Sequence, residues 1–431
     1  MKVLDAEKIT GIETFFTNSK GCGGKLRTDP EDFFVKEISN YPPKNEKGKF
    51  TIADVTSTNW ETNRLIREIS NRVHISRKRI GFAGTKDKRA KTVQLMSFYK
   101  TPIQDLQSIN IKDVSIENIY KSDRPVKIGN LQGNSFEINI KNIESETSLE
   151  DIKKIAKKLI DTAGFPNFFG IQRFGIQRPI THIVGKYIVN GDFKKAVMTY
   201  VANPIEGEGE ETFQFRKNLK ETNDFAEALK SYPNYLNFEK AMLNKLVICP
   251  EDFVAALKEL PANLLTMFVN AYQSYLFNKI LSRRIENKVP LNKAVTGDII
   301  LVYRNGIIEE KTIKVNSDNI QKVNRQISKG NAFVSGILYG SDSEFSDGAM
   351  GKIEHEIISK EKIDPRDFII PEIPYISSSG TRRPILAPVR NLEFKLNKKS
   401  TSLNLKFDLL KGSYATSLLR EFMKADNIRN Y

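Results

Sequence analysis

The sequence of 431 residues is poor in the side chains that build metal centres and disulfide frameworks. It holds two cysteines, Cys22 and Cys249, which are far apart, and three histidines, His74, His182 and His355. Two distant cysteines exclude a disulfide framework and a cysteine-rich zinc site. Because the histidines are scattered as well, we expect no metal site.

Long apolar runs are also missing. The first 24 residues lack the continuous apolar segment of a signal peptide, and no stretch approaches the length of a membrane span. Apolar residues make up 39% of the chain and charged residues 28%, which is the balance of a soluble globular protein. At this length we expect two domains, one of which can be inserted in the other, and a cytoplasmic location.

The net charge of +15 is unevenly distributed. Residues 61–100 hold 11 Lys/Arg against 3 Asp/Glu, and residues 381–431 hold 11 against 4. The other 340 residues carry 45 charges of each sign. If the fold brings the two basic segments together, they form one positive field that suits a polyanion such as nucleic acid. Composition alone leaves open that they are two separate solvated faces.

Apolar periodicity predicts most of the regular elements. Strands are predicted by alternating apolar residues at 31–39, 49–57, 92–99, 125–143, 392–396 and 403–409. Helical spacing predicts helices at 61–73, 148–164 and 412–424. The second of these helices is expected to begin at Ser148 and to stop at Gly164. A hairpin is predicted at 299–310, with Asn305 and Gly306 at its turn.

The densest basic run, "GFAGTKDKRAKTVQ" (81–94), has a single carboxylate, Asp87, at its centre. The flanking patterns place Asp87 on a loop between strands, where rigid folds often display chemistry. The run does not match a P-loop, because Gly81 and Gly84 are too close and no Gly-Lys-Ser/Thr follows. The chain also lacks a GxSxG elbow or a Cys/His pair for acyl chemistry.

Asp87 has two interpretations from the residues alone. Aspartate is common in turns, because its side chain bonds nearby backbone amides. Alternatively, Lys86, Lys88 and Arg89 favour its ionised form and attract an anionic substrate, so that the carboxylate acts as a nucleophile or base. A lone carboxylate argues against the paired acids of a glycosidase.

The segment "FAGTKDKRAKTVQ" resembles the AG-x-KD-x-x-A-x-T-x-Q signature of the TruD family of pseudouridine synthases, in which the Asp is catalytic. Further blocks resemble that family in the same order along the chain: "EDFFVKE" (31–37), "GNLQGNSFEI" (129–138), "PNFFGIQRFG" (166–175), "AYQSYLFN" (271–278) and "KGSYATSLLREF" (411–422). The resemblance covers essentially the whole chain. It departs at Ile171, where bacterial members tend to carry Glu.

The resemblance implies an α+β fold, a pseudouridine synthase core with a mixed, largely antiparallel sheet flanked by helices, plus an inserted α/β TRUD domain. The catalytic domain would be discontinuous, 1–165 and 381–431, the insertion would be 166–380, and RNA would bind in the cleft between them. The implied reaction breaks the N-glycosidic bond of a tRNA uridine, at U13 or alternatively U35, and rejoins the base to the ribose through carbon. It needs no metal, nucleotide or redox cofactor and no membrane.

The resemblance also assigns roles to residues. Asp87 would be the nucleophile, Phe136 would stack on the flipped uracil, and Arg420 would pair with Asp87. The expected substrate-binding residues are Lys36, which would contact phosphate or the Asp, and Lys86, Lys88, Arg89, Gly129, Asn134, Gln172 and Arg173.

Two of these assignments have plainer alternatives. Phe136 shares a strand face with Ile138 and Ile140 and could simply be core, and Arg420 could be a solvated helix charge. A protein of another class, a non-catalytic RNA-binding protein or RNA chaperone, would use the same cleft. The intact Asp87 and Arg420 favour the enzyme, and a nucleic-acid glycosidase would need a second acid that the sequence does not offer.

Overall fold

A computed structural model describes residues 3–304 and 306–431 of the chain. The chain folds into two compact units. The first, called here the strand-rich unit, comprises Thr17–Phe165 and Ala387–Tyr431. The second, called the helix-rich unit, comprises Met1–Phe16 and Pro166–Leu386.

The first sixteen residues group differently from the predicted domain boundaries, which placed them with the catalytic segments. They belong to the helix-rich unit. The Asn278 amide donates to the carbonyl of Thr10 at 2.9 Å, and the Ser282 hydroxyl donates to that of Gly11 at 3.0 Å. These side-chain bonds satisfy the backbone of a segment that has little regular structure of its own.

The strand-rich unit is built on a sheet of ten strands, in the order β6-β3-β5-β2-β7-β14-β13-β8, with β1 on β7 and β4 on β5. β2 and β5 pair in parallel, whereas β2 and β14 both pair antiparallel with β7. The strands are β1 (Gly23–Lys25), β2 (Phe33–Ser39), β3 (Phe50–Thr58), β4 (Ile80–Phe82), β5 (Lys91–Tyr99), β6 (Val114–Ser122), β7 (Leu131–Ile143), β8 (Gly164–Pro166), β13 (Leu386–Asn397) and β14 (Ser402–Leu410). The predicted fold class, α+β with a mixed and largely antiparallel sheet, is confirmed.

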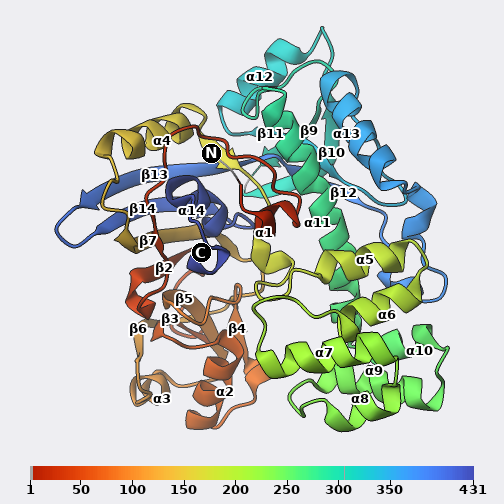
Figure 1. The fold of residues 1–431 in the computed structure, drawn as a ribbon. Helices are drawn as coiled ribbons and strands as arrows, with labels where there is room; N and C mark the ends of the chain where they lie inside the picture. The colour runs from red at the N-terminus through yellow and green to blue at the C-terminus, as the bar shows by residue number, and fades with distance from the viewer. Residues whose placement is uncertain (1–2, 305) are drawn as a thin grey trace. The chain divides into compact units, whose positions relative to one another are not determined.

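Four helices flank this sheet: α2 (Thr62–Arg72), α3 (Ile103–Gln107), α4 (Leu149–Asp161) and α14 (Ala415–Met423). Figure 1 shows α4 and α14 at the β7, β14 and β13 end, and α2 and α3 at the β3 and β6 end. The predicted start of α4 is confirmed, because the Ser148 hydroxyl accepts from the Glu150 amide at 3.2 Å. The predicted stop is wrong: Ala163 takes the left-handed conformation after the helix (φ 58°), and Gly164 already begins β8.

The apolar face of α2 forms one core of the unit. Leu65, Ile66 and Ile69 are buried against Val55 and Met96 from β3 and β5. The spacing of the three helix residues turns one stripe to the sheet and leaves the polar stripe, which is rich in arginine, exposed.

The helix-rich unit combines helices with a four-stranded sheet in the order β10-β9-β11-β12. Its longer helices are α5 (Thr181–Val189), α6 (Phe193–Ala202), α7 (Glu210–Thr222), α9 (Asn237–Ile248), α11 (Ala262–Glu286), α12 (Ile320–Ser328) and α13 (Gly348–Glu361), with α1 (Asp5–Lys8), α8 (Phe225–Ser231) and α10 (Phe253–Lys258) shorter. Its strands are β9 (Ile299–Arg304), β10 (Ile307–Lys314), β11 (Ala332–Leu338) and β12 (Thr381–Pro384). Figure 1 shows α11 running from the cluster of α5 to α10 to this sheet.

All three pairings in this second sheet are antiparallel, so the α/β description expected for the inserted domain becomes α+β. β9 and β10 form the predicted hairpin. The predicted turn residue Asn305 lies outside the described residues.

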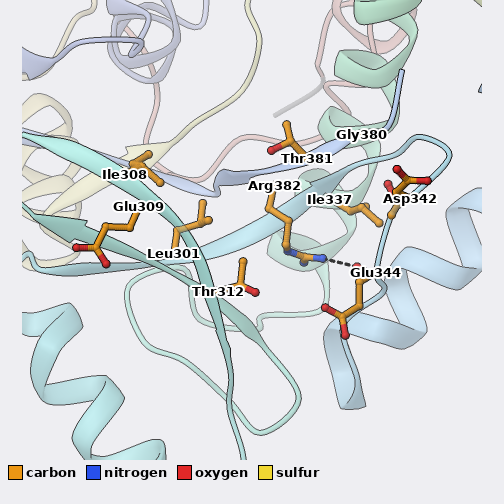
Figure 2. Close-up of a pocket in the computed structure, with 11 residues that line it drawn as sticks. Leu301, Ile308, Glu309, Thr312, Ile337, Asp342, Glu344, Gly380, Thr381 and Arg382 are labelled. Atoms are coloured by element: carbon orange, nitrogen blue, oxygen red, sulfur yellow. Dashed lines mark hydrogen bonds between the residues drawn. The ribbon is translucent and has the colours of Figure 1, made fainter. Parts of the chain in front are cut away.

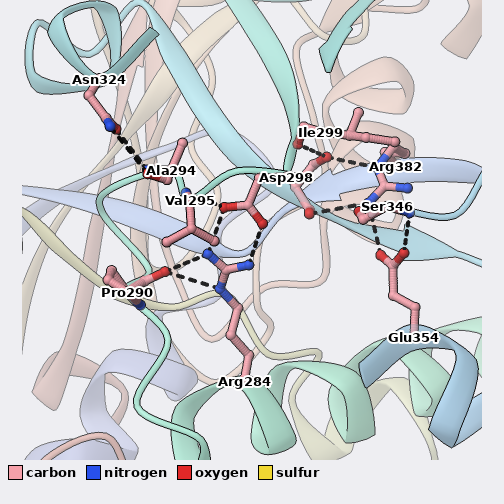
Figure 3. A network of polar contacts seen from close by, with 11 residues as sticks. Arg284, Pro290, Ala294, Val295, Asp298, Ile299, Asn324, Ser346, Glu354 and Arg382 are labelled. Atoms are coloured by element: carbon pink, nitrogen blue, oxygen red, sulfur yellow. Dashed lines mark hydrogen bonds and ion pairs between the residues drawn. The ribbon is translucent and has the colours of Figure 1, made fainter. Parts of the chain in front are cut away.

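Buried ion pairs connect elements of the helix-rich unit, and Figure 3 shows two of them. The Arg284 guanidinium on α11 donates to both carboxylate oxygens of Asp298 at 2.6 and 2.9 Å, and both side chains are fully buried. Arg382 on β12 pairs with Glu354 on α13 at 2.8 Å. Buried charges are tolerated when geometry and further hydrogen bonds offset their desolvation, and Arg284 also donates to the carbonyl of Pro290.

Candidate active site

Asp87 lies on an irregular loop, residues 83–90, between β4 and β5 of the strand-rich unit. Its Oδ2 accepts a hydrogen bond from Nη2 of Arg27 at 3.1 Å. The side chain is 51% exposed, and Oδ1 has no partner among the residues that the structure describes. One carboxylate oxygen is therefore oriented by a cation, and the other is available to a substrate.

Arg27 was not predicted from the sequence. Its guanidinium lies 4.0 Å above the ring of Phe33 and is largely buried. Its backbone is left-handed (φ 53°), a conformation that side chains other than glycine adopt rarely. Arg27 stands just before the "EDFFVKE" block, and no local pattern indicates that its side chain turns toward Asp87.

The predicted ion pair between Arg420 and Asp87 is wrong. Asp87 forms its ion pair with Arg27, whereas the buried Arg420 pairs with Oε1 of Glu421 at 3.4 Å. The reason lies in α14, which is buried around nearly its whole circumference. A residue beside the apolar stripe of such a helix does not reach an open edge.

Phe136 lies on the same face of the central strands as Glu37, whose carboxylate pairs with Lys86 of the Asp87 loop. It is 9% exposed and stands opposite Val35 of β2 and Phe407 of β14. The Phe136 and Phe407 rings stack with centroids 5.2 Å apart, and Phe33 approaches edge-on at 6.3 Å. One face of the Phe136 ring is therefore occupied by Phe407.

Asn134 precedes Phe136 by two positions and so shares its face of β7. Its Oδ1 is buried without a hydrogen-bond partner in the described part of the chain. An unsatisfied buried acceptor is costly, and such groups occur where a ligand completes the bonding. Among the predicted substrate-binding residues, Asn134 and Arg173 each have an unsatisfied buried atom in the described part of the chain.

Gly129 contacts the first residue of the Asp87 loop. Its amide donates to the carbonyl of Ala83 at 2.8 Å, and its carbonyl accepts from Nζ of Lys411 at 3.3 Å. Its φ of +85° lies in the left-handed region that favours glycine. Segments around 83, 129 and 411 therefore converge within one unit.

Three of the five cations predicted to bind substrate, Lys86, Lys88 and Arg89, lie on the Asp87 loop. Nζ of Lys86 forms a buried ion pair with Oε2 of Glu37 at 2.8 Å, and its predicted place in substrate binding stays a prediction. Nη2 of Arg89 donates to the carbonyl of Thr28 at 3.1 Å. Lys88 is exposed and has no ion-pair partner among the described residues.

Lys36 does not contact Asp87, because alternate residues of a strand point to opposite faces. Glu37 and Val35 point to the Phe136 face of β2, so Lys36 points away from it. Its predicted contact with Asp87 is wrong, and a phosphate contact stays a prediction.

Gln172 and Arg173 belong to the helix-rich unit, in the 3₁₀ turn η3 (Ile171–Arg173). Gln172 is exposed, and Nε of Arg173 is buried without a hydrogen-bond partner in the part of the chain that the structure describes. Their place beside the substrate stays a prediction.

A separate pocket of about 310 Å³ lies on the four-stranded sheet of the helix-rich unit (Figure 2). Its lining includes the carboxylates of Glu309, Asp342 and Glu344 and one cation, Arg382. The Arg382 guanidinium is already bonded to Glu354 and to the carbonyl of Glu344. Glu309 and Glu344 are paired with Arg304 and Lys314, and no cation among the described lining residues is left unpaired to bind an RNA phosphate, so the pocket is not included in the candidate site.

Over residues 3–304 and 306–431, no cluster of three or more His, Cys, Asp or Glu side chains is arranged to hold a metal ion. Over the same residues, no helix is both long and apolar enough to cross a membrane.

Comparison with known proteins places the site in a family. Residues 9–422 match the family tRNA pseudouridine synthase D (TruD). A Methanosarcina mazei protein named "Probable tRNA pseudouridine synthase D" is 42% identical over the full length of both chains, and one of the same name from Thermococcus sibiricus is 39% identical over 98% of this chain and all of its own. The chain belongs to the TruD family. The predicted family is confirmed, and the protein is an RNA pseudouridine synthase, an isomerase.

The crystal structure of a TruD protein from Methanosarcina mazei supports the same fold. It superposes with a TM-score of 0.92 at 42% identity, over the whole of both chains. The TruD match spans the Asp87 loop, β7 and most of α14, so the blocks that carried the resemblance lie within it.

Proposed function

We propose that this TruD protein isomerises a tRNA uridine, U13 or alternatively U35, with Asp87 as the nucleophile. The observation that carries the proposal is the state of the Asp87 carboxylate, which has one oxygen bonded to Arg27 and the other unpartnered among the described residues. The relatives' names supply the tRNA substrate. The strand-rich unit would be the catalytic domain, and the helix-rich unit would be the insertion.

The reaction exchanges one glycosidic bond for another. The bond from N1 to the ribose C1′ breaks, a bond from C5 to C1′ forms, and the proton on C5 is replaced by one on the freed nitrogen. The target base must leave its stack to meet the carboxylate. Asn134 offers a buried acceptor to the flipped uracil, and Phe136 supports it through the part of its ring that Phe407 leaves uncovered.

The decisive variant is Asp87→Asn, which keeps the shape of the side chain and removes its nucleophile. Loss of one covalent catalyst costs many orders of magnitude in rate. We expect a folded protein that binds tRNA transcript normally and forms no pseudouridine. Mapping the modified position in the wild-type reaction assigns the uridine.

The matched control is Asp105→Asn, which changes an exposed aspartate on α3 of the same unit. It should leave both binding and turnover unchanged. Substantial pseudouridine formation by folded Asp87→Asn protein would remove Asp87 from the nucleophile role.

A further inference from the structure

The loop that carries Asp87 lacks the repeating hydrogen bonds of a helix or strand. A loop of this kind moves unless specific contacts hold it. Catalysis needs the reacting group held close to its productive geometry. The side-chain contacts of residues 83–90 therefore decide where the carboxylate points.

The strongest of these contacts is the ion pair between Lys86 and Glu37. Their side chains are 7% and 1% exposed, and the atoms are 2.8 Å apart. The Lys86 amide also donates to the hydroxyl of Thr62 at the start of α2, at 2.8 Å. Glu37 accepts a second bond, from the hydroxyl of Ser39 at 2.8 Å. Lys86 is thus fixed at both its backbone and its charged end.

The pair is unusual in its surroundings. Residues 61–100 hold 11 cations against 3 acids, and Lys86 lies beside exposed Lys88, yet its own charge is withdrawn from solvent. Burying an ion pair adds little stability, because desolvation offsets the attraction. The better-attested use of such a pair is to select one conformation among several.

We propose that Glu37 is a positioning residue for Asp87. Its buried carboxylate holds Lys86, and Lys86 holds the adjacent residue so that the Asp87 carboxylate meets Arg27 from one direction. The bond from Arg89 to Thr28 secures the other end of the loop. The proposal rests on the proposed function, in which Asp87 is the nucleophile.

The alternative roles of the pair are stability alone or RNA binding by Lys86. A purely structural pair would change the unfolding free energy and leave the chemistry of the folded fraction intact. A phosphate-binding Lys86 would change affinity and its salt dependence. Positioning instead changes the rate of the chemical step at saturating RNA.

The test compares Glu37→Gln with Glu354→Gln, the same change in a buried ion pair of the helix-rich unit. Single-turnover pseudouridine formation at saturating tRNA transcript, transcript affinity and urea unfolding are measured for both. We expect the rate of folded Glu37→Gln protein to fall at least tenfold with affinity within about twofold. Folded Glu354→Gln protein should keep the wild-type rate.

A second variant guards against loss of folding. The double change Glu37→Gln and Lys86→Met removes both buried charges, so no unpaired ion remains inside. It should fold better than Glu37→Gln alone and remain at least tenfold slow, because the loop anchor is still missing.

Two results would overturn the positioning role. One is a normal single-turnover rate in the folded fraction of both Glu37 variants. The other is a loss confined to affinity with a smaller salt dependence, which would assign Lys86 to RNA. Failure of the proposed function looks different, since Asp87→Asn would then retain turnover whatever the Glu37 variants do.

Discussion

The strand-rich unit carries 36 Lys/Arg and 23 Asp/Glu, a net charge of +13, whereas the helix-rich unit carries 31 and 29, a net charge of +2. The two units are of comparable size, so the difference in net charge does not come from a difference in length. Nearly all the excess positive charge belongs to the unit that holds Asp87. Electrostatic attraction of a polyanion is therefore expected mainly from the strand-rich unit.

The units also differ in how their charges are paired. The helix-rich unit buries complete ion pairs, such as Arg284 with Asp298 and Arg216 with Glu239. In the strand-rich unit, a group of exposed cations has no ion-pair partner among the described residues: Arg64, Arg67, Arg77, Lys78 and Lys88. The strand-rich unit also buries an ion pair, Lys86 with Glu37, but these exposed cations remain available to a ligand.

The largest expected effect is on the stability of the helix-rich unit. Arg284→Met leaves the carboxylate of Asp298 buried without its cation, which costs about 3–5 kcal/mol of unfolding free energy. Urea unfolding measures this loss. Adding Asp298→Leu should recover most of it, and the folded fraction should keep its single-turnover rate. A lower single-turnover rate in folded Arg284→Met protein would show that this ion pair contributes to catalysis. The two units would then not differ in the role of their ion pairs.

Phe136→Ala tests whether one residue serves both packing and substrate. Truncating a buried Phe costs about 3–5 kcal/mol of stability, and base stacking contributes about 1–3 kcal/mol. The control is Phe98→Ala, a fully buried residue in another core of the same unit. We expect similar destabilisation in thermal melts, but slower turnover in the folded fraction of Phe136→Ala alone. Equal turnover in the two variants would leave Phe136 as core.

Substitutions of Arg27 test whether an ion pair of the strand-rich unit contributes to catalysis. Arg27→Ala removes the cation that orients Asp87 and should lower the single-turnover rate about 10–100-fold, roughly 1.4–2.7 kcal/mol. Arg27→Lys should retain part of the rate, because a point charge orients a carboxylate less well than a guanidinium fork. Lys25→Ala, an exposed cation two residues earlier, is the control. An unchanged single-turnover rate in Arg27→Ala would show that the Arg27–Asp87 ion pair does not contribute to catalysis.

The smallest effect concerns the exposed cations. Replacing Arg64 and Arg67 by Gln should lower the slope of log affinity against log salt by about 0.7–0.9 for each lost phosphate contact. The matched pair, Lys217→Gln and Lys220→Gln on α7 of the helix-rich unit, should leave the slope unchanged. Binding to a tRNA transcript over a range of salt concentrations measures both. Equal changes of the salt slope in the two variants would indicate that both units contact the RNA.

Local pattern was sufficient for most elements of the strand-rich unit. The helices predicted at 61–73 and 412–424 correspond to α2 and α14, and the strands predicted at 31–39 and 403–409 correspond to β2 and β14. Periodicity predicts these because burial on one face imposes a repeat of 3.6 or 2 residues. Periodicity did not predict the end of α4, because Ala163 rather than Gly164 adopts the left-handed conformation.

By itself the sequence determined the family, the α+β class and the loop that carries Asp87, since each is written in contiguous residues. Only the tertiary structure decided which cation meets that carboxylate. Arg27 and Asp87 are sixty positions apart, and Arg27, not Arg420, reaches it. In the same way it decided that Lys86 faces a buried Glu37. Ion pairing depends on distance in space and on exclusion of water, and neither quantity is encoded in the spacing of residues along the chain.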